Sequence, residues 1–394
     1  MLPLEGVTVV ALEQAVAAPL ATRSLADLGA RVIKVERVDG GDLARGYDHV
    51  VHGSASHFVW LNRGKESLAV DLKSERGADA VRALIAKSDV VVQNLAPGAA
   101  ARLGLDAEAL RVDHDRLIVV TMSGYGSGGP FAHHKAYDML IQAEAGLISL
   151  TGTPDHPAKT GIPTSDIAAG MYASQAVLAA LVRRGVSGVG AAIDISMLDA
   201  TIEWMGHALY TQLYAGAPPP RMGVSHAAIA PYDAYPTSDG QMLIGVQSDP
   251  GWRDLVNKAL DAPELADDER FSTNVLRVRH RAECDAAVAD RTRRYSTAEL
   301  ADRLLAAGVP AAQLKQIGDV IAHPQLQARD RWRRVATEFA TIEALLPPAT
   351  FADFEAPMGA VPALGQHTRA LLGESGLTGE QIDSMVTAGI AAQR

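Results

Sequence analysis

The sequence predicts an α/β fold, with a parallel sheet in a large domain and a second, smaller domain. Three observations support this prediction. Short β-branched runs alternate with helical segments in the first half, which is the rhythm of βαβ units. The 394 residues exceed what a single hydrophobic core usually holds. Two Pro-rich stretches, 215–225 and 345–365, interrupt the second half.

The first half supplies the strands and helices of the predicted sheet. "GVTVVALE" (6–13) and "RVIKVER" (31–37) are short runs rich in β-branched residues, and "PLATRSLADLG" between them is a helix that Gly29 ends. A helix and a strand follow at 75–88 and 89–95, and 116–126 adds another strand. Because helices connect successive strands, the strands are expected to be parallel and covered by helices.

The second half predicts a helical stretch at 166–212, then a linker, a strand at 241–247 and a mostly helical segment at 249–312. A Pro-rich crossing and a helical tail end the chain. The expected boundaries are 1–214 for the first part of the large domain, 215–225 for the linker, 226–330 for the small domain, 331–365 for a return linker and 366–394 for the C-terminal part of the large domain.

Composition excludes several classes of protein. The net charge of −10 disfavours a nucleic-acid binder, which needs a basic face. The single cysteine, Cys284, excludes a disulfide framework and a cysteine-based zinc site, and its surroundings predict an exposed helix and no catalytic thiol. The first residues have no basic segment typical of a signal peptide, and we expect no membrane span. A cytoplasmic enzyme is therefore expected.

Common catalytic and cofactor motifs are weak or missing. "GYGSGG" (124–129) matches G-x-G-x-x-G after a strand, but no ribose-binding acid follows about 20 residues later, so a tight glycine loop beside a site is the better interpretation. The histidines show no metal-binding spacing, and we expect no metal. No G-x-S-x-G is present, which disfavours the usual α/β-hydrolase.

Basic residues gather where the predicted strands end. They are Lys34, Arg37, Arg63, Lys73 and Arg102. In a protein of negative net charge, cations at the ligand-binding edge of a sheet favour a phosphate-bearing ligand. Any one of them alone is more often a solvated surface charge.

Asp166 stands at the beginning of an apolar helix, in "KTGIPTSDIAAGMYASQAVLAAL" (159–181). Such a residue is commonly the helix N-cap, because its oxygen accepts a free backbone N–H of the first turn. A carboxylate at that position is also held in the positive end of the helix dipole and can act as a nucleophile. The local sequence leaves both roles open.

Many ordered blocks resemble the family III CoA-transferases of the CaiB/BaiF type, which include formyl-CoA transferase and carnitine CoA-transferase. They are "LADLGARVIKVE", "NRGKESLAVDL", "DVVVQNLAPG", "SGYGSGGP", "AYDMLIQAEAGL", "SDIAAGMYA", "GVGAAIDISMLDA", "APYDAYPTSDG" and "LGQHT". The resemblance runs through nearly the whole chain.

The resemblance implies a CoA-transferase of acyl-CoA metabolism that uses acyl-CoA and a carboxylic acid as substrates and has no tightly bound cofactor. It implies a Rossmann-like large domain built from both chain ends, in an interlocked homodimer. The family's catalytic aspartate corresponds to Asp166, and Tyr137 corresponds to a tyrosine that lines the active site. The CoA-binding positions correspond to Arg37, Lys73, Asn94 and Arg102. Backbone N–H groups of the loop with Gly124 and Gly126 are candidates to stabilise an oxyanion.

Two departures bear on the substrate. Val16 replaces the glutamine of formyl-CoA transferase, and Gln247 stands in place of its glycine-rich lid. The pattern is more similar to the branch that handles succinyl-, mesaconyl- or citramalyl-type dicarboxylates. A dicarboxylate needs a cation for its distal carboxylate, and the candidates are Arg45, Arg221 and His226.

Two alternatives stay open. One is an enzyme similar to the α-methylacyl-CoA racemases, although this chain has Ala136-Tyr137-Asp138 where that branch has a histidine before its aspartate, and His134 is two positions out of register. The other is a non-catalytic nucleotide-binding α/β module, which has no use for Asp166.

Overall fold

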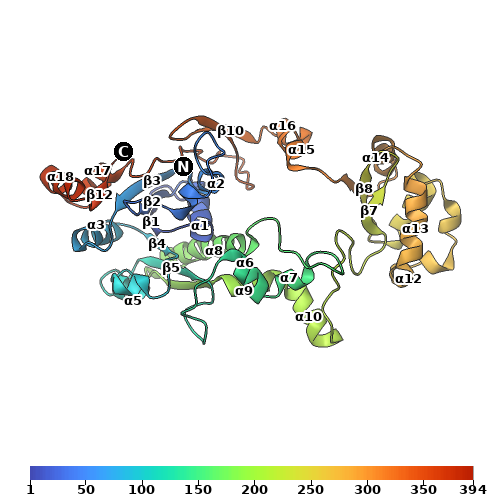
Figure 1. Ribbon diagram of the computed structural model, residues 1–394, viewed down its shortest axis with the longest axis horizontal. Coiled ribbons are helices and arrows are strands. Elements are labelled where there is room, and N and C mark those ends of the chain that lie inside the picture. Colours follow the sequence, from blue (N-terminus) through green and yellow to red (C-terminus); the bar gives the residue numbers. More distant parts are fainter. Residues whose placement is uncertain (394) are drawn as a thin grey trace. The chain divides into compact units, whose positions relative to one another are not determined.

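The computed structural model describes residues 1–393, which form two compact units (Figure 1). The large unit comprises Met1–Leu147, Lys159–His207 and the segment from Asp330 onward. The small unit comprises Ile148–Ala158 and Ala208–Arg329. Residues 208–214, expected in the large domain, therefore belong to the small unit, and the large unit is made from both ends of the chain.

A seven-stranded sheet in the order β12-β3-β2-β1-β4-β5-β6 forms the centre of the large unit. All neighbouring strands are parallel except β12 and β3. The strands are β1 (Thr8–Leu12), β2 (Arg31–Glu36), β3 (Lys65–Val70), β4 (Val90–Gln93), β5 (Ile118–Ser123), β6 (Ala192–Ser196) and β12 (Ala391–Ala392). The chain leaves β1 in one direction and returns to β4 on its other side, so a crevice opens at the carboxyl ends of these two strands.

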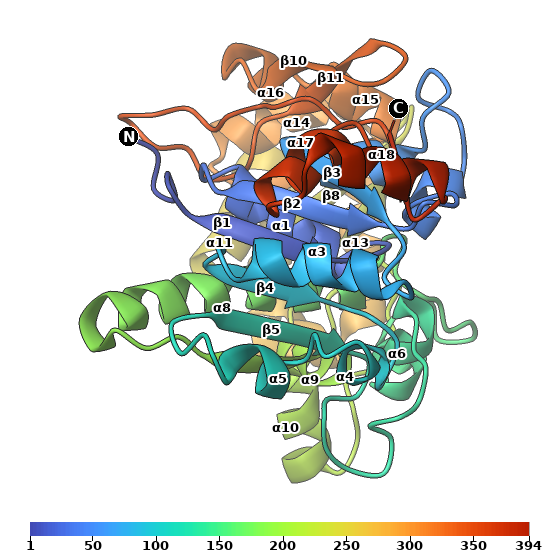
Figure 2. The same ribbon diagram turned by 90° about the vertical axis from the view of Figure 1, so that its left-hand side faces the viewer.

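Helices cover both faces of this sheet, because most residues of its central strands are apolar and buried on either side. On β1, Val9 and Ala11 pack on the side of α1 (Ala17–Ala26) and α8 (Thr164–Ser187). Val10 and Leu12 pack on the opposite side, which the remaining helices cover. Those helices are α3 (Glu75–Ile85), α5 (Ala107–Arg111), α17 (Thr368–Glu374) and α18 (Gly379–Thr387). Figure 2 shows this second group in front of the strands.

The C-terminal part of the chain completes the large unit beside β3, as Figures 1 and 2 both show. The guanidinium of Arg31 contacts the carboxylates of Glu66 and Glu374 and joins β2 and β3 to α17. The segment 331–365 was expected to be only a linker, and that expectation is wrong. It contains a hairpin of β10 (Trp332–Ala336) and β11 (Thr341–Leu345), whose Val335 packs in a small core with Phe58.

The predicted helical stretch 166–212 is interrupted. Helix α8 ends at Ser187, followed by Gly188 in the left-handed conformation, and strand β6 joins the sheet before the next helices begin. A Cβ at Gly190 would lie 2.2 Å from the carbonyl oxygen of Leu117, so the chain must carry glycine where it re-enters the sheet. The alternation of Ile193 and Ile195 was the signal for this strand. Helices α9 (Met197–Trp204) and α10 (Gly206–Ala215) follow.

Helix α8 is long and apolar enough to cross a bilayer by length and composition alone. Its contacts explain the apolar composition in another way. Ala169, Ala173 and Val177 are buried in the core that the helix shares with the sheet. Such a core helix passes the same test, so α8 is weak support for a membrane protein.

The small unit combines a three-stranded antiparallel sheet with helices. The strands are β7 (Tyr232–Pro236), β8 (Gln241–Gly245) and β9 (Ala311–Gln313). The helices after β8 include α11 (Asp249–Asp254), α12 (Asn274–Arg279), α13 (Arg281–Thr292) and α14 (Thr297–Ala306). Cys284 on α13 is fully buried, so the expectation of an exposed helix face there is wrong. Burial raises the pKa of its thiol to about 12, which disfavours the reactive thiolate.

Candidate functional site

A cavity of about 650 Å³ lies at the carboxyl ends of the central strands of the large unit. This is the edge at which open α/β sheets bind ligands. Its walls come from the turn after β1, the loop after β4 and the end of β5, together with the segments before α6 (Asp138–Glu144) and α8. Asp166, in the first turn of α8, lines it.

Asp166 does not cap its own helix. The backbone N–H groups of Ser165 and Asp166 donate to one carboxylate oxygen of Asp138, at 2.8 and 3.1 Å. The second oxygen of Asp138 accepts a hydrogen bond of 2.7 Å from the side chain of Gln142. The cap of α8 is thus supplied by α6, and within residues 1–393 the half-buried carboxylate of Asp166 receives no hydrogen bond.

The surroundings of Asp166 disfavour its charge. Burial, and then the negative charge of Asp138, raise the pKa of Asp166 to about 7. Such a shift in a cavity-lining acid is typical of functional sites. At neutral pH the side chain therefore exists in both protonation states.

The turn after β1 forms the wall that contains Val16. The N–H of Gln14 donates to Asn94 Oδ1 and the carbonyl of Gln14 accepts from Asn94 Nδ2, both at 2.9 Å. Val16 and Leu20 pack against Ile167, the neighbour of Asp166. Val16 therefore gives this wall an apolar surface next to the candidate acid.

The glycine loop after β5 is only partly in the site. Gly124 lines the cavity, and a Cβ there would lie 2.2 Å from the Cβ of Ala136, so glycine permits the close approach of these segments. The N–H of Gly126 donates to Ser123 Oγ, and that of Ser127 donates to Asp194. Because the N–H groups of Gly126 and Ser127 are used within the fold, neither of these two is free to stabilise an oxyanion.

The residues expected to bind CoA are divided between two cavities. Asn94 lines the first cavity, as Tyr137 does with 70% of its surface exposed. Arg37 and Lys73 line a neighbouring cavity of about 430 Å³ in the large unit. Gln14 and Leu95 line both cavities and connect them.

Arg102 lies at the end of the short helix α4 (Ala99–Arg102), with its side chain exposed. It does not line either of these two cavities. Its position after β4 nevertheless keeps it on the same edge of the sheet as Asn94.

The three cations expected to be free for a distal carboxylate are all engaged. Arg45 contacts Glu36 through two hydrogen bonds of 2.8 Å and lies 3.7 Å from the ring centre of Phe58. Arg221 donates to backbone carbonyls of Ser149, Thr153 and Pro154. His226 accepts a hydrogen bond from the N–H of Ala228 and stacks on Tyr232. Of the three, only Arg45 is paired with an acid among residues 1–393, whereas Arg221 is held by backbone carbonyls and His226 accepts a hydrogen bond.

Gln247 belongs to the small unit, where it lines a separate cavity of about 620 Å³. Asp166 belongs to the large unit. Each of these two predicted residues lines a cavity of its own unit.

Other polar residues of the first cavity were not identified from the sequence. They are Tyr47, His57, Lys135 and Lys159. The two lysines are exposed and line the cavity that Asp166 also lines, and no ion pair involves either of them in the part of the chain that the structure describes. Lys159 is the first residue of the segment that leads into α8, and this was the only signal for it. No three His, Cys, Asp or Glu side chains among residues 1–393 gather as metal ligands do.

Comparison with known proteins agrees with this architecture. The succinate–glutarate CoA-transferase of Agrobacterium fabrum is 36% identical over 385 residues, which cover 94% of this chain and 95% of that one. The human succinyl-CoA:glutarate CoA-transferase is 32% identical and covers 94% of this chain and 86% of its own. The crystal structure of a CaiB/BaiF family protein from Brucella suis superimposes with a TM-score of 0.83 at 35% identity, over 95% of this chain and 99% of that one.

The model of CoA-transferase family III matches residues 4–368, which include both units and the cavity with Asp166. The resemblance found in the sequence blocks is confirmed by this match and by the relatives. The chain belongs to CoA-transferase family III and is an enzyme that transfers CoA.

Proposed function

We propose that this enzyme moves CoA from a succinyl-CoA-type donor to a small dicarboxylic acid, with Asp166 as the nucleophile. The observation that carries the proposal is the carboxylate of Asp166, which lines a cavity at the ligand-binding edge of the sheet while another acid caps its helix. The named relatives act on succinyl-CoA, succinate and glutarate, which supports a dicarboxylate substrate.

The exchange takes place in four steps. The Asp166 carboxylate attacks the thioester carbonyl of the donor, and the C–S bond breaks to give an aspartyl–acyl anhydride and CoA thiolate. The thiolate attacks the aspartyl carbonyl, which releases the donor acid and leaves an aspartyl–CoA thioester. The acceptor carboxylate attacks this thioester and again gives an anhydride and thiolate. The thiolate then attacks the acyl carbonyl, which forms the new acyl-CoA and restores Asp166.

The surroundings of Asp166 suit this role. A carboxylate whose pKa is near 7 is more basic than an ordinary aspartate, and therefore a better nucleophile, while enough of it is ionised at neutral pH. The intermediates are a mixed anhydride and a thioester, which water would hydrolyse, and the apolar wall with Val16 and Ile167 helps to exclude water.

The two connected cavities give CoA a path. Its phosphates lie near Arg37 and Lys73, and its pantetheine arm passes Gln14 to bring the thioester to Asp166. Asn94 holds the turn beside this path, and Arg102 adds a cation at the same sheet edge. CoA is thus a substrate, and no tightly bound cofactor is needed.

Lys135 and Lys159, in place of Arg45, Arg221 and His226, bind the distal carboxylate of the dicarboxylic acid. Leaving a distal carboxylate unpaired in a water-poor site costs on the order of 3 kcal/mol of binding free energy. Both lysines line the cavity of Asp166, whereas the three earlier candidates are engaged elsewhere. A dicarboxylic acyl group can therefore place one carboxyl at Asp166 and the other at these ammonium groups.

We further propose the interlocked homodimer that the family resemblance implies, in the cytoplasm. The large unit draws on both chain ends, as that assembly requires. Exposed apolar side chains on α8 and α9 of the large unit fit a subunit contact. They include Met171, Val182, Val186 and Trp204.

The test combines succinyl-CoA with isotope-labelled glutarate and follows labelled glutaryl-CoA by mass spectrometry. Asp166→Ala abolishes the exchange while the protein stays folded, and the wild type gives a covalent enzyme–CoA adduct on a peptide that contains Asp166.

Replacing Lys135 and Lys159 with alanine raises the KM for glutarate but leaves that for acetate almost unchanged. Full turnover by the Asp166→Ala variant refutes the mechanism. Deuterium incorporation at the α-carbon without any acceptor acid supports the racemase alternative instead.

A further inference from the structure

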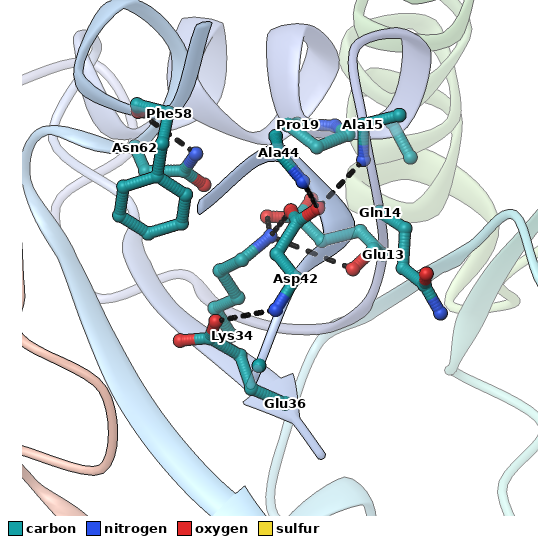
Figure 3. Close-up of polar contacts among 12 residues, drawn as sticks. Glu13, Gln14, Ala15, Pro19, Lys34, Glu36, Asp42, Ala44, Phe58 and Asn62 are labelled. Atoms are coloured by element: carbon teal, nitrogen blue, oxygen red, sulfur yellow. Dashed lines mark hydrogen bonds and ion pairs between the residues drawn. The ribbon is translucent and has the colours of Figure 1, made fainter. Parts of the chain in front are cut away.

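A network of charged side chains, all buried except the half-buried Arg45, lies directly beneath the turn after β1 (Figure 3). Three acids and three bases form it, so its formal charge is zero. The acids are Glu13, Glu36 and Asp42, and the bases are Lys34, Lys65 and Arg45. Such a network is costly to bury and strongly destabilising to break, which raises the question of what it does here.

Lys34 is the centre of this network and is fully buried on β2. Its ammonium group lies 2.7 Å from Asp42 Oδ2 and 3.2 Å from Glu13 Oε1, and Figure 3 shows it between these two side chains. Lys65 binds the same Glu13 oxygen at 2.6 Å. The carboxylate of Asp42 is therefore fixed from below by Lys34.

The other oxygen of Asp42 holds the turn. Asp42 Oδ1 accepts hydrogen bonds of 2.9 Å from the N–H groups of Ala15 and Ala44. Ala15 has a φ of +63°, in the left-handed region that residues with a Cβ rarely adopt. A backbone in this conformation persists only where its surroundings hold it. Asp42 binds the N–H of Ala15 itself, and Asn94 holds the preceding residue, Gln14.

The held turn is a wall of the candidate active site. Gln14, Ala15 and Val16 all line the cavity of Asp166. Val16 packs against Ile167, the residue after Asp166. The position of the turn therefore sets the space between this wall and the carboxylate.

We propose that Asp42, oriented by Lys34, is a positioning residue for CoA transfer, because it holds Ala15 in the left-handed conformation and so places the wall that faces Asp166. Neither side chain lines the cavity of Asp166, and neither is given a chemical step. The kinetic part of this proposal rests on the proposed function.

Asp42→Ala removes the acceptor of the Ala15 N–H, and Lys34→Met removes the group that orients Asp42. Each lowers kcat at least about tenfold and changes the KM for the acyl-CoA by less than about threefold, since the misplaced wall affects the reacting centre more than CoA binding. Adding Ala15→Gly to Asp42→Ala restores kcat to within about threefold of the wild type, because glycine adopts a positive φ without a clamp. A rescue of this kind is not expected if Asp42 only stabilises the fold.

Asp27→Asn is the matched control. Asp27 is also a buried acid, paired with Arg63 at 2.7 Å, but it lies at the opposite end of α1 from the turn. This variant lowers the melting temperature and leaves kcat of the folded protein unchanged. Equal kcat losses per folded molecule in Asp27→Asn and Asp42→Ala refute the proposal.

Ala15→Val provides a variant in which every buried charge is kept, in case the others fail to fold. A β-branched side chain disfavours the left-handed conformation, so kcat falls as in Asp42→Ala.

Hydrogen exchange of the peptide 14–18 tests the positioning without an activity measurement. The exchange becomes faster in Asp42→Ala and stays at the wild-type rate in Asp27→Asn. Unchanged exchange and unchanged kcat in Asp42→Ala overturn the inference. A wild type without CoA transfer, combined with faster exchange in Asp42→Ala, refutes the proposed function alone.

Discussion

At the scale of single residues, Asp166 is an acid whose surroundings disfavour its ionised form. Burial, and then Asp138, hold the pKa of Asp166 near 7, although the beginning of α8 favours a negative charge there. Asp138 uses the free N–H groups of that helix for itself. One acid thus stabilises the helix and at the same time makes the other acid more basic.

This arrangement predicts the pH dependence of the enzyme. The nucleophile must be ionised, so kcat/KM rises as pH increases through about 7 and is flat above it. Asp138→Asn keeps an oxygen for the cap but removes its charge, so the rising limb moves to lower pH by about one unit. The measurement is kcat/KM from pH 5 to 9.

Glu144 is an exposed acid on the same helix α6, and its variant Glu144→Gln serves as the control, which leaves the rising limb in place. A limb that does not move in Asp138→Asn contradicts the coupling.

The sequence predicted Asp166 through its block, but it could not predict which cations are free. Arg45 is used by Glu36, nine residues earlier, and Arg221 is used by backbone carbonyls about 70 residues away. Whether an arginine is engaged depends on such partners, which spacing along the chain does not reveal. Lys135 and Lys159 were missed for the same reason, since only the fold places them in the cavity that Asp166 lines.

At the scale of elements, the packing of α1 against α8 positions Asp166 relative to the wall with Val16. Gly170 lies at their contact, where a Cβ would come within 2.6 Å of the carbonyl oxygen of Ala17 and 3.0 Å of the Cβ of Leu20. Helix α8 can therefore approach α1 closely just one turn after Asp166. The glycine is needed for packing, although it is unfavourable inside an isolated helix.

Gly170→Ala should lower the free energy of unfolding by about 1–3 kcal/mol, because the backbone oxygen of Ala17 must move. It should lower kcat as well, since α8 shifts against the wall with Val16. Gly185→Ala is the control on the same helix: no atom lies within 4 Å of its added Cβ, so helix propensity raises the free energy of unfolding by up to about 1 kcal/mol. Urea denaturation of both variants checks the pair. Equal effects of the same sign would show that packing at Gly170 does not matter.

Elements were predictable where a periodic pattern is long and uniform. The strands that became β1, β2, β4 and β5 are buried on both faces, and their short runs rich in β-branched residues indicated them. Strand β6 was assigned to a helix because five residues between two helices give little periodicity. The β10–β11 hairpin was missed because Pro-rich neighbours dominate the stretch 345–365.

At the scale of the whole molecule, the chain begins and ends in the same unit. Strand β12 pairs with β3 and α17 packs beside it, while Ala208–Arg329 of the small unit lies between these segments in the sequence. Two Pro-rich linkers were predicted from the residues, whereas the interlocked dimer was predicted only from the family resemblance. A linker is a property of one chain, but a dimer depends on contacts between two chains, which no local pattern encodes.

Interlocking makes a prediction that separates it from an ordinary dimer. If each subunit passes through its partner, the two cannot part without unfolding. Tagged and untagged native enzyme, mixed and incubated for a day, should then form no mixed dimers, whereas refolding the same mixture from urea should give tagged–untagged pairs in statistical proportion. Affinity capture followed by mass spectrometry measures the mixed species, and dilution to nanomolar concentration should yield no monomer. An ordinary dimer with a contact through α8 and α9 would exchange subunits on dilution, so mixed dimers in the native sample would contradict interlocking while leaving the chemistry of Asp166 untouched.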